Sequence, residues 1–216
     1  MRLYVDTADA DALTRAHATG YVFGVTTNPT LLRAAKLSRD DLPALVQRAV
    51  GARFQEIHLQ VLSDDLEGML RDARALHALD PAHVVVKIPA TATGFRAARM
   101  VAQEGLRLTI TAVYAVRQVV LAEAVGARYA AVYFGRLRDA GQDAIALLRG
   151  MMETVRAQSL ATQLLVASVR SAEDVETLAQ LGVPAVTLPP PILFALPEHA
   201  GTAQAVQSFQ DDAIHL

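Results

Sequence analysis

Short apolar runs rich in β-branched residues alternate with longer stretches of helical period, and the alternation repeats eight times along the 216 residues. Each repeat takes about 27 residues. Strands separated by helices and apolar on both faces require a parallel sheet covered by helices. The strands are expected at 2–6, 22–26, 54–61, 83–88, 106–112, 129–134, 163–168 and 184–188.

The stretches between the strands have apolar residues three or four positions apart, as amphipathic helices do. Asp64 and Asp65 begin one of them, where the helix dipole favours negative charge. Helices are expected at 8–18, 39–50, 64–79, 94–104, 115–125, 141–157, 171–181 and, last, 202–213. Glycines fall at five helix ends and suit left-handed caps, at positions 20, 51, 105, 126 and 182.

Eight strand–helix units predict closure into a (β/α)8 TIM barrel, a single α/β domain over 1–216 with a C-terminal helix. An open doubly wound sheet is the alternative, but the turn after the first strand lacks the GxGxxG dinucleotide fingerprint. Neither a linker nor a charge block divides the chain. The proline-rich segment 184–201 is expected to be irregular and to turn the chain before its last helix.

Composition excludes several classes of function. Twenty Lys and Arg against 22 Asp and Glu leave a charge of −2, with no basic excess to hold nucleic acid. The chain has no cysteine and no apolar run of the length a membrane span needs, and its first residues are not expected to form a signal peptide. We therefore expect a cytoplasmic protein that acts on small molecules. The histidines lack ligand spacing, so no metal site is inferred from positions 17, 58, 77, 83, 199 and 215.

Polar residues interrupt the apolar strands near their carboxyl ends, where barrels of this kind place their chemistry. They recur about once per strand–helix unit, as expected if each strand contributes one side chain to a common mouth. These residues are Asp6, Asn28, Gln60, Lys87, Thr111, Tyr133 and Ser168. For Asp6, Asn28 and Ser168, a helix-capping role explains the residue type as well as a catalytic one does.

Lys87 follows three valines and precedes Ile88, so its neighbours demand burial on both faces of the sheet. Burial disfavours the ammonium form and lowers the pKa of a lysine. A free amine in a pocket is the nucleophile that forms a Schiff base with a carbonyl substrate. The alternatives are a lysine that reaches outward to the surface or one paired with a carboxylate.

Three neutral residues on flanking strands could surround that amine. Gln60, Thr111 and Tyr133 can hold one water or hydroxyl group without adding a charge that would trap the amine as ammonium. Each also has a structural interpretation, as a polar strand residue or a packed aromatic. Arg136 and Ser168 could bind a phosphate, the serine at the start of a helix and the arginine through a bidentate contact.

Four stretches resemble the small transaldolase family, and most closely its fructose-6-phosphate aldolase branch. The resemblance covers Met1 to about Gln210. It rests on Leu3-Tyr4-Val5-Asp6-Thr7, Gly24-Val25-Thr26-Thr27-Asn28-Pro29-Thr30, Val84-Val85-Val86-Lys87-Ile88-Pro89 and Thr111-Ala112-Val113-Tyr114. It implies a (β/α)8 barrel whose fourth-strand lysine, here Lys87, forms a Schiff base with a ketose. It also implies pentamers or decamers and no metal or organic cofactor.

The resemblance assigns further roles. Asp6 matches the aspartate that handles the proton of the hydroxyl beside the cleaved bond. The residues that hold the catalytic water match Gln60, Thr111 and Tyr133. Contacts to the ketose hydroxyls and the phosphate match Thr26, Asn28, Arg136 and Ser168. The implied substrates are sugar phosphates, aldehydes and ketones, with no nucleic-acid or membrane partner.

Two features separate the branches of this family. Transaldolases carry Glu and Phe where this chain has Gln60 and Tyr133, which favours a class I aldolase acting on a ketose phosphate such as fructose 6-phosphate. The run Phe134-Gly135-Arg136 instead resembles transaldolases, whereas the aldolases have Asn before that Arg. The alternatives are therefore a transaldolase that passes dihydroxyacetone to an aldose phosphate, and a catalytically silent sugar-phosphate-binding barrel.

Overall fold

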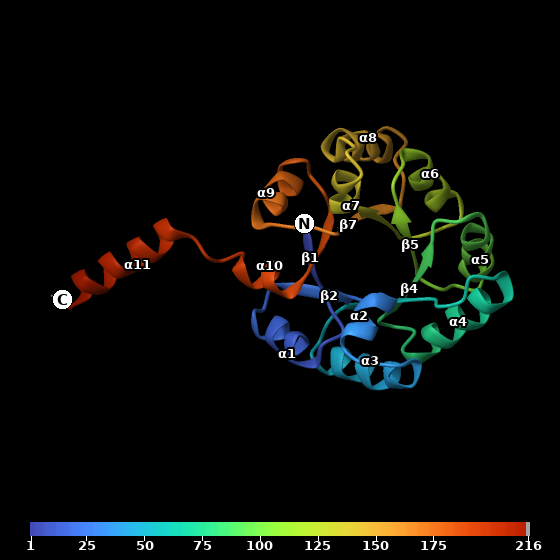
Figure 1. The fold of residues 1–216 in the computed structure, drawn as a ribbon, viewed down its shortest axis with the longest axis horizontal. Helices are drawn as coiled ribbons and strands as arrows, with labels where there is room; N and C mark the ends of the chain where they lie inside the picture. The colour runs from blue at the N-terminus through green and yellow to red at the C-terminus, as the bar shows by residue number, and fades with distance from the viewer. Residues whose placement is uncertain (215–216) are drawn as a thin grey trace.

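Eight parallel strands close into a barrel in the computed structural model, which describes residues 1–214 (Figure 1). Each strand pairs with its successor, and the first pairs with the last through the register Leu3↔Val186. The strands are β1 (Arg2–Asp6), β2 (Val22–Thr26), β3 (Glu56–Gln60), β4 (Val84–Pro89), β5 (Leu108–Val113), β6 (Tyr129–Tyr133), β7 (Gln163–Ala167) and β8 (Ala185–Leu188). The predicted TIM barrel is confirmed, and the open sheet was the wrong alternative.

Helices between the strands form the outer layer, and their apolar faces pack on the barrel in one large core. These are α1 (Ala10–Ala18), α3 (Leu42–Gly51), α4 (Leu66–Leu79), α5 (Ala92–Gln103), α6 (Val116–Ala124), α8 (Ala144–Ala157) and α9 (Ala172–Gln180). Each lies within a few residues of its predicted range. No helix among residues 1–214 has both the length and the hydropathy needed to cross a membrane.

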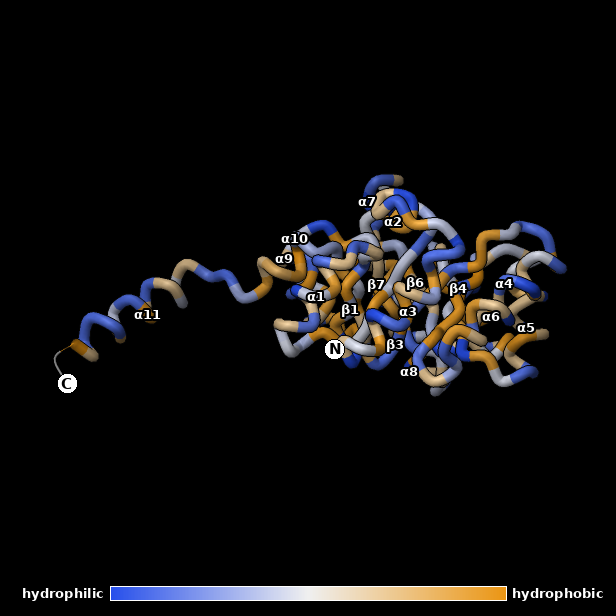
Figure 2. The backbone as a smooth tube through the Cα atoms, turned by 90° about the horizontal axis from the view of Figure 1, so that it is seen from below, coloured by the Kyte–Doolittle hydropathy of each residue, from blue (hydrophilic) through white to orange (hydrophobic). Residues whose placement is uncertain are grey.

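Three short helices were not predicted: α2 (Pro29–Ala34), α7 (Phe134–Asp139) and α10 (Pro190–Ala195). Six residues are too few to display a helical period. The 3-10 turn η1 (Arg39–Asp41) forms the start of the stretch predicted to be helical at 39–50. The strand predicted at 184–188 is β8, whereas the remainder of segment 184–201, which was expected to be irregular, contains α10. Seen from the side, α2 and α7 stand at the end of the barrel opposite the N-terminus (Figure 2).

One of the predicted glycine caps is wrong. Gly51 is the last residue of α3, and the left-handed backbone lies two residues later, at Arg53 with φ 59°. The other four glycines adopt positive φ as expected.

A hydrogen-bonded group of buried polar side chains lies in the lower barrel interior, beside apolar residues such as Val85. Glu56 accepts hydrogen bonds from Tyr4 at 2.7 Å and from His58 at 3.3 Å, and it pairs with Arg128 at 3.1 Å. His58 also contacts the Thr109 hydroxyl at 3.0 Å. Burial opposes the charge on Glu56, but His58, Tyr4 and Arg128 more than offset it and lower its pKa to about 2. These groups satisfy one another and close the floor of the barrel.

The last helix, α11 (Ala200–Ala213), projects away from the barrel and buries none of its residues (Figure 1). Its apolar side chains include Val206, 47% exposed, and Phe209, 68% exposed. An isolated helix of this length is marginal in water, because most helical stability comes from packing an apolar face.

Candidate active site

Lys87 points into the barrel from β4 and is only 5% exposed. Its Nζ donates a hydrogen bond of 2.6 Å to the backbone carbonyl of Thr27, and not to a carboxylate. Burial lowers the pKa of Lys87, and the negative charge of Asp6 opposes that shift in part. The alternative in which this lysine reaches outward to the surface is therefore wrong, because its amine lies in the barrel interior.

A cavity of about 410 Å³ opens at the carboxyl ends of the strands and contains Lys87 in its wall. It brings together eight of the nine predicted site residues: Asp6, Thr26, Asn28, Gln60, Lys87, Tyr133, Arg136 and Ser168. The ninth, Thr111, joins them through a contact of 3.2 Å between its hydroxyl and that of Tyr133. Small or apolar side chains complete the wall, among them Ala131, Leu165 and Ala167.

Asp6 lies at the end of β1 and accepts a hydrogen bond of 2.6 Å from the Thr26 hydroxyl. Burial raises the pKa of Asp6, while Lys87 and Thr26 oppose that shift. Asp6 does not cap a helix, since the cap of α1 is Asp9. A carboxylate with a raised pKa is a stronger base, and a proton-transfer role suits it.

Thr187 was not predicted, although it is part of the cavity wall and lies 2.6 Å from Thr26 through their hydroxyls. It precedes an apolar residue in an ordinary strand pattern, so no sequence signal singles it out. Thr26 links the predicted residue Asp6 with the unpredicted Thr187, because its hydroxyl donates to the first and contacts the second.

Neutral hydrogen-bonding groups face the amine from the other side. Burial raises the pKa of Tyr133, which keeps its hydroxyl protonated and able to donate at neutral pH. Within residues 1–214, the Gln60 Oε1 is buried without a hydrogen-bond partner. A buried acceptor without a partner is costly and calls for a bound water or ligand. The pair of Tyr133 and Thr111 together with Gln60 can therefore hold a water.

The backbone is strained at two positions beside Tyr133. Ala112 has φ 59° and lies where the pairing of β5 with β6 shifts register. Ser168 has φ 61°. L-residues other than Asn and Asp rarely adopt this conformation, and it concentrates at functional sites. The irregularity in β5 directly follows Thr111. The surrounding structure has to hold the backbone of Ala112 in this strained conformation.

Ser168 was expected at the start of a helix, but this prediction is wrong. Helix α9 begins four residues later, at Ala172, and is capped by the side chain of Ser171. Ser168 instead accepts a hydrogen bond of 3.0 Å from the Gly135 amide through its carbonyl. A Cβ on Gly135 would lie 2.1 Å from that oxygen and 2.7 Å from Nε of Arg170. The backbones of β7 and α7 can meet only because residue 135 has no side chain.

Arg136 and Asn28 border the cavity, and Arg170 lies near Gly135 and Ser168. The Arg136 guanidinium carbon lies 4.9 Å from the ring centroid of Tyr133. Arg170, predicted to be an ordinary surface charge, lies beside Gly135 and pairs with Asp139 at 2.6 Å. Asn28 does cap α2, accepting the Leu31 amide at 3.0 Å, and its side chain still borders the cavity. The capping interpretation of Asn28 is confirmed, and its role in binding substrate stays a prediction.

No cluster of three potential metal ligands occurs in the part of the chain that the structure describes. Five of the six histidines lie within that part, and His58 is buried in the polar floor. His215 lies outside the described residues. The chemistry that the cavity offers comes from an amine, a carboxyl group, hydroxyls, an amide and a guanidinium.

The titration of Lys87 can be followed directly, because the chain has two lysines, Lys36 and Lys87, and Lys36 is exposed. We expect the pKa of Lys87 to fall further in Asp6→Asn, since the Asp6 charge is what raises it. The measurement is an NMR pH titration after reductive ¹³C-methylation, with Lys36 as the internal control. A Lys87 signal that titrates together with that of Lys36 would contradict the burial argument.

The chain matches the family model described as Transaldolase/Fructose-6-phosphate aldolase over residues 3–215. A probable transaldolase of Heliobacterium modesticaldum is 35% identical over 212 residues, covering 98% of this chain and 97% of that protein. A probable transaldolase of an Anaeromyxobacter species is 37% identical over 213 residues, with 98% and 97% coverage.

Among solved structures, thiamine phosphate pyrophosphorylase from Pyrococcus furiosus aligns with a TM-score of 0.64 at 15% identity, over 91% of this chain and 93% of that one. At that identity the likeness supports the barrel fold alone. The sequence matches are far more specific, since they run through nearly the whole chain. This chain belongs to the transaldolase/fructose-6-phosphate aldolase family.

Proposed function

We propose that the protein is a class I aldolase that cleaves or forms a ketose phosphate such as fructose 6-phosphate, with dihydroxyacetone and glyceraldehyde 3-phosphate as the other partners. The observation that carries this proposal is a buried amine with a lowered pKa, which donates its hydrogen bond to a backbone carbonyl and lies in the wall of a cavity that also contains Asp6, Gln60 and Tyr133. Such an amine attacks carbonyl carbon and forms a Schiff base.

The first half of the reaction builds an electron sink. The Lys87 amine adds to the C2 carbonyl of the ketose, and loss of water from the carbinolamine leaves an iminium ion. Asp6 then takes the proton of the C4 hydroxyl. The C3–C4 bond breaks, its electron pair moves toward the iminium nitrogen, and the aldehyde leaves as the enamine forms.

The second half returns the enzyme to its resting state. Asp6 returns its proton through a water held by Tyr133, Gln60 and Thr111, which protonates the enamine at C3, and the resulting iminium is hydrolysed by water to dihydroxyacetone and free Lys87. The unpartnered Gln60 Oε1 and the Thr111–Tyr133 contact support this assignment. Because these groups are neutral, they add no charge that would keep the amine protonated.

Substrate contacts follow from the cavity wall. We assign the phosphate to Arg136 and Ser168, because both border the cavity, and Arg170 lies near Ser168. Guanidinium groups bind phosphate through paired charge-assisted hydrogen bonds. Thr26 and Asn28 are assigned to the ketose hydroxyls. No step of this mechanism requires a metal or an organic cofactor.

A transaldolase is the second candidate, in which the enamine waits for an aldose phosphate acceptor. The relatives compared above are named probable transaldolases, which favours this candidate. The close approach at Gly135 supports it as well, because an Asn there would collide with Ser168. Tyr133 and Gln60 favour the aldolase, since they supply the water that ends the reaction by hydrolysis.

We further infer that the chain forms homo-oligomers through α11. The helix carries exposed apolar residues and packs on nothing in its own chain. Its apolar face gains stability only when another surface covers it. A second copy of the chain is the partner that is always present, and a helix exchanged between copies joins them in a closed ring.

Trapping with borohydride tests the Schiff base. Wild-type protein treated with fructose 6-phosphate should acquire a reduced adduct on Lys87, because the amine is free and faces the cavity. Lys87→Met should acquire none, and Lys36 should remain unmodified in both. Peptide mass spectrometry makes the measurement. An undiminished adduct in Lys87→Met, or no adduct in the wild type, defeats the proposal.

Partition of the enamine separates the two candidate reactions. For an aldolase, dihydroxyacetone should be released from fructose 6-phosphate at a rate that does not depend on erythrose 4-phosphate. Tyr133→Phe should slow that release by about 10²–10⁴-fold, since a proton-transfer group is lost, while transfer to the acceptor persists. Release that requires the acceptor in the wild type would identify a transaldolase. Thermal stabilisation by the sugar phosphate without any turnover would instead favour a silent binding barrel.

The role of α11 can be measured by sedimentation equilibrium. Phe209→Ser and Val206→Ser should weaken self-association, because they remove the apolar contacts that the helix offers. Gln207→Ser, a change of an exposed polar residue on the same helix, serves as the control. A wild-type protein that is monomeric at micromolar concentration would overturn this inference.

A further inference from the structure

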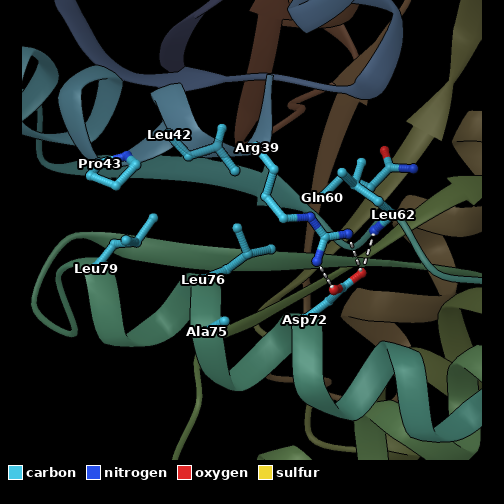
Figure 3. Close-up of a pocket in the computed structure, with 9 residues that line it drawn as sticks. All are labelled: Arg39, Leu42, Pro43, Gln60, Leu62, Asp72, Ala75, Leu76 and Leu79. Carbon is cyan, nitrogen blue, oxygen red and sulfur yellow. Dashed lines mark hydrogen bonds and ion pairs between the residues drawn. The ribbon is translucent and has the colours of Figure 1, made fainter. Parts of the chain in front are cut away.

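The loop after β3 begins directly behind Gln60, and one buried carboxylate holds it. Asp72 of α4 is 5% exposed, and its Oδ2 accepts the backbone amides of Leu62 and Ser63, each at 2.9 Å. Figure 3 shows Asp72 reaching from its helix to the Leu62 amide. Strand β3 ends at Gln60, and Val61 follows it. The carboxylate therefore fixes the next two residues, Leu62 and Ser63.

Arg39 completes the arrangement from another part of the chain. Its guanidinium contacts both oxygens of Asp72, at 2.5 Å and 3.4 Å (Figure 3). Burial opposes the charge on Asp72, but the amides of Ser63 and Leu62 and the Arg39 guanidinium outweigh it and lower the pKa. Asp72 is thus charged at neutral pH, and it ties η1, the loop and α4 together.

Two further contacts restrain the loop after β3. The Val61 amide donates to the Lys87 carbonyl at 3.0 Å. A Cβ on Gly68 would lie 2.5 Å from that of Ser63, so the loop rests directly on the first turn of α4. The backbone on the carboxyl side of Gln60 is therefore held on two sides, by β4 and by Asp72.

Gln60 separates two cavities. It borders the Lys87 cavity and also a smaller one of about 90 Å³, which lies between η1, α3 and α4 and contains the Arg39–Asp72 pair in its wall. In Figure 3 the Gln60 amide points away from that pair. Because its Oε1 has no partner among residues 1–214, the direction of this side chain depends on its backbone.

We propose that Asp72 and Arg39 are positioning residues that hold the Gln60 amide in the Lys87 cavity. The inference rests on the proposed function, in which Gln60 holds the water that protonates the enamine. Asp72 and Arg39 do not touch that water. They act through the Leu62–Ser63 backbone, which sets the direction of the preceding strand end.

A double-mutant cycle between Asp72 and Gln60 tests this proposal. Asp72→Asn should lower kcat by up to about 10²-fold with little change in KM, because a small displacement of the Gln60 amide misplaces the water. In a Gln60→Ala background, Asp72→Asn should cause almost no further loss, since the positioned group is absent. A role in stability alone predicts equal losses in both backgrounds.

Arg39→Met supplies a second route to the same answer if Asp72→Asn does not fold, because the Arg39 side chain is 56% exposed. It should cause a smaller kcat loss that also disappears in the Gln60→Ala background, and Arg39→Lys should restore part of it. The matched control is Arg74→Met, which breaks an ion pair of the same helix with Glu104, away from the loop. Arg74→Met should leave kcat unchanged.

Two readouts separate failure of this inference from failure of the proposed function. Borohydride trapping on Lys87 reports the Schiff base alone, and we expect the adduct in every variant. The side-chain amide NMR signal of Gln60, assigned by its loss in Gln60→Ala, should shift in Asp72→Asn whether or not the protein turns over substrate. An unshifted signal, or additive kinetic losses, overturns the inference. A missing adduct in wild type overturns the function instead.

Discussion

Burial of one amine without a counter-ion is the constraint on which this structure depends. Moving an ammonium ion out of water costs several kcal/mol, and a carboxylate in direct contact would repay that cost while keeping the ion charged. The barrel offers Lys87 a backbone carbonyl at 2.6 Å instead, and leaves Asp6 to act at longer range. The result is an amine that readily gives up its proton in a cavity open to carbonyl compounds.

The closed barrel makes this arrangement possible in two ways. Parallel pairing places Gln60 beside Lys87, and each of the eight strands contributes a residue to the wall of the same cavity. Below them, the polar floor of Glu56, His58 and their partners satisfies its own hydrogen bonds. The lower barrel therefore stays closed and ordered, and the chemistry is confined to the upper end.

The outer shell of the site depends on parts of the chain that carry no catalytic signal. Asp72 and Arg39 hold the loop behind Gln60, and Gly135 lets α7 lie against Ser168. The strained backbone at Ala112 likewise depends on its surroundings, because the neighbouring strands hold the residue in that conformation. The geometry of the cavity wall therefore depends on supporting contacts made by residues outside that wall.

Sequence alone determined the alternation of strands and helices, the closure expected from eight units, and the ring of polar strand ends around Lys87. Those features repeat along the sequence, and in a parallel barrel residues that recur once per strand–helix unit come to lie at the same end of neighbouring strands. Only the tertiary structure decided that Asn28 caps a helix while Ser168 does not, that Thr187 joins Asp6 and Thr26, and that Asp72 reaches the loop after β3. Each of these depends on contacts between residues distant in sequence or on a single backbone angle, and neither leaves a repeating pattern in the chain.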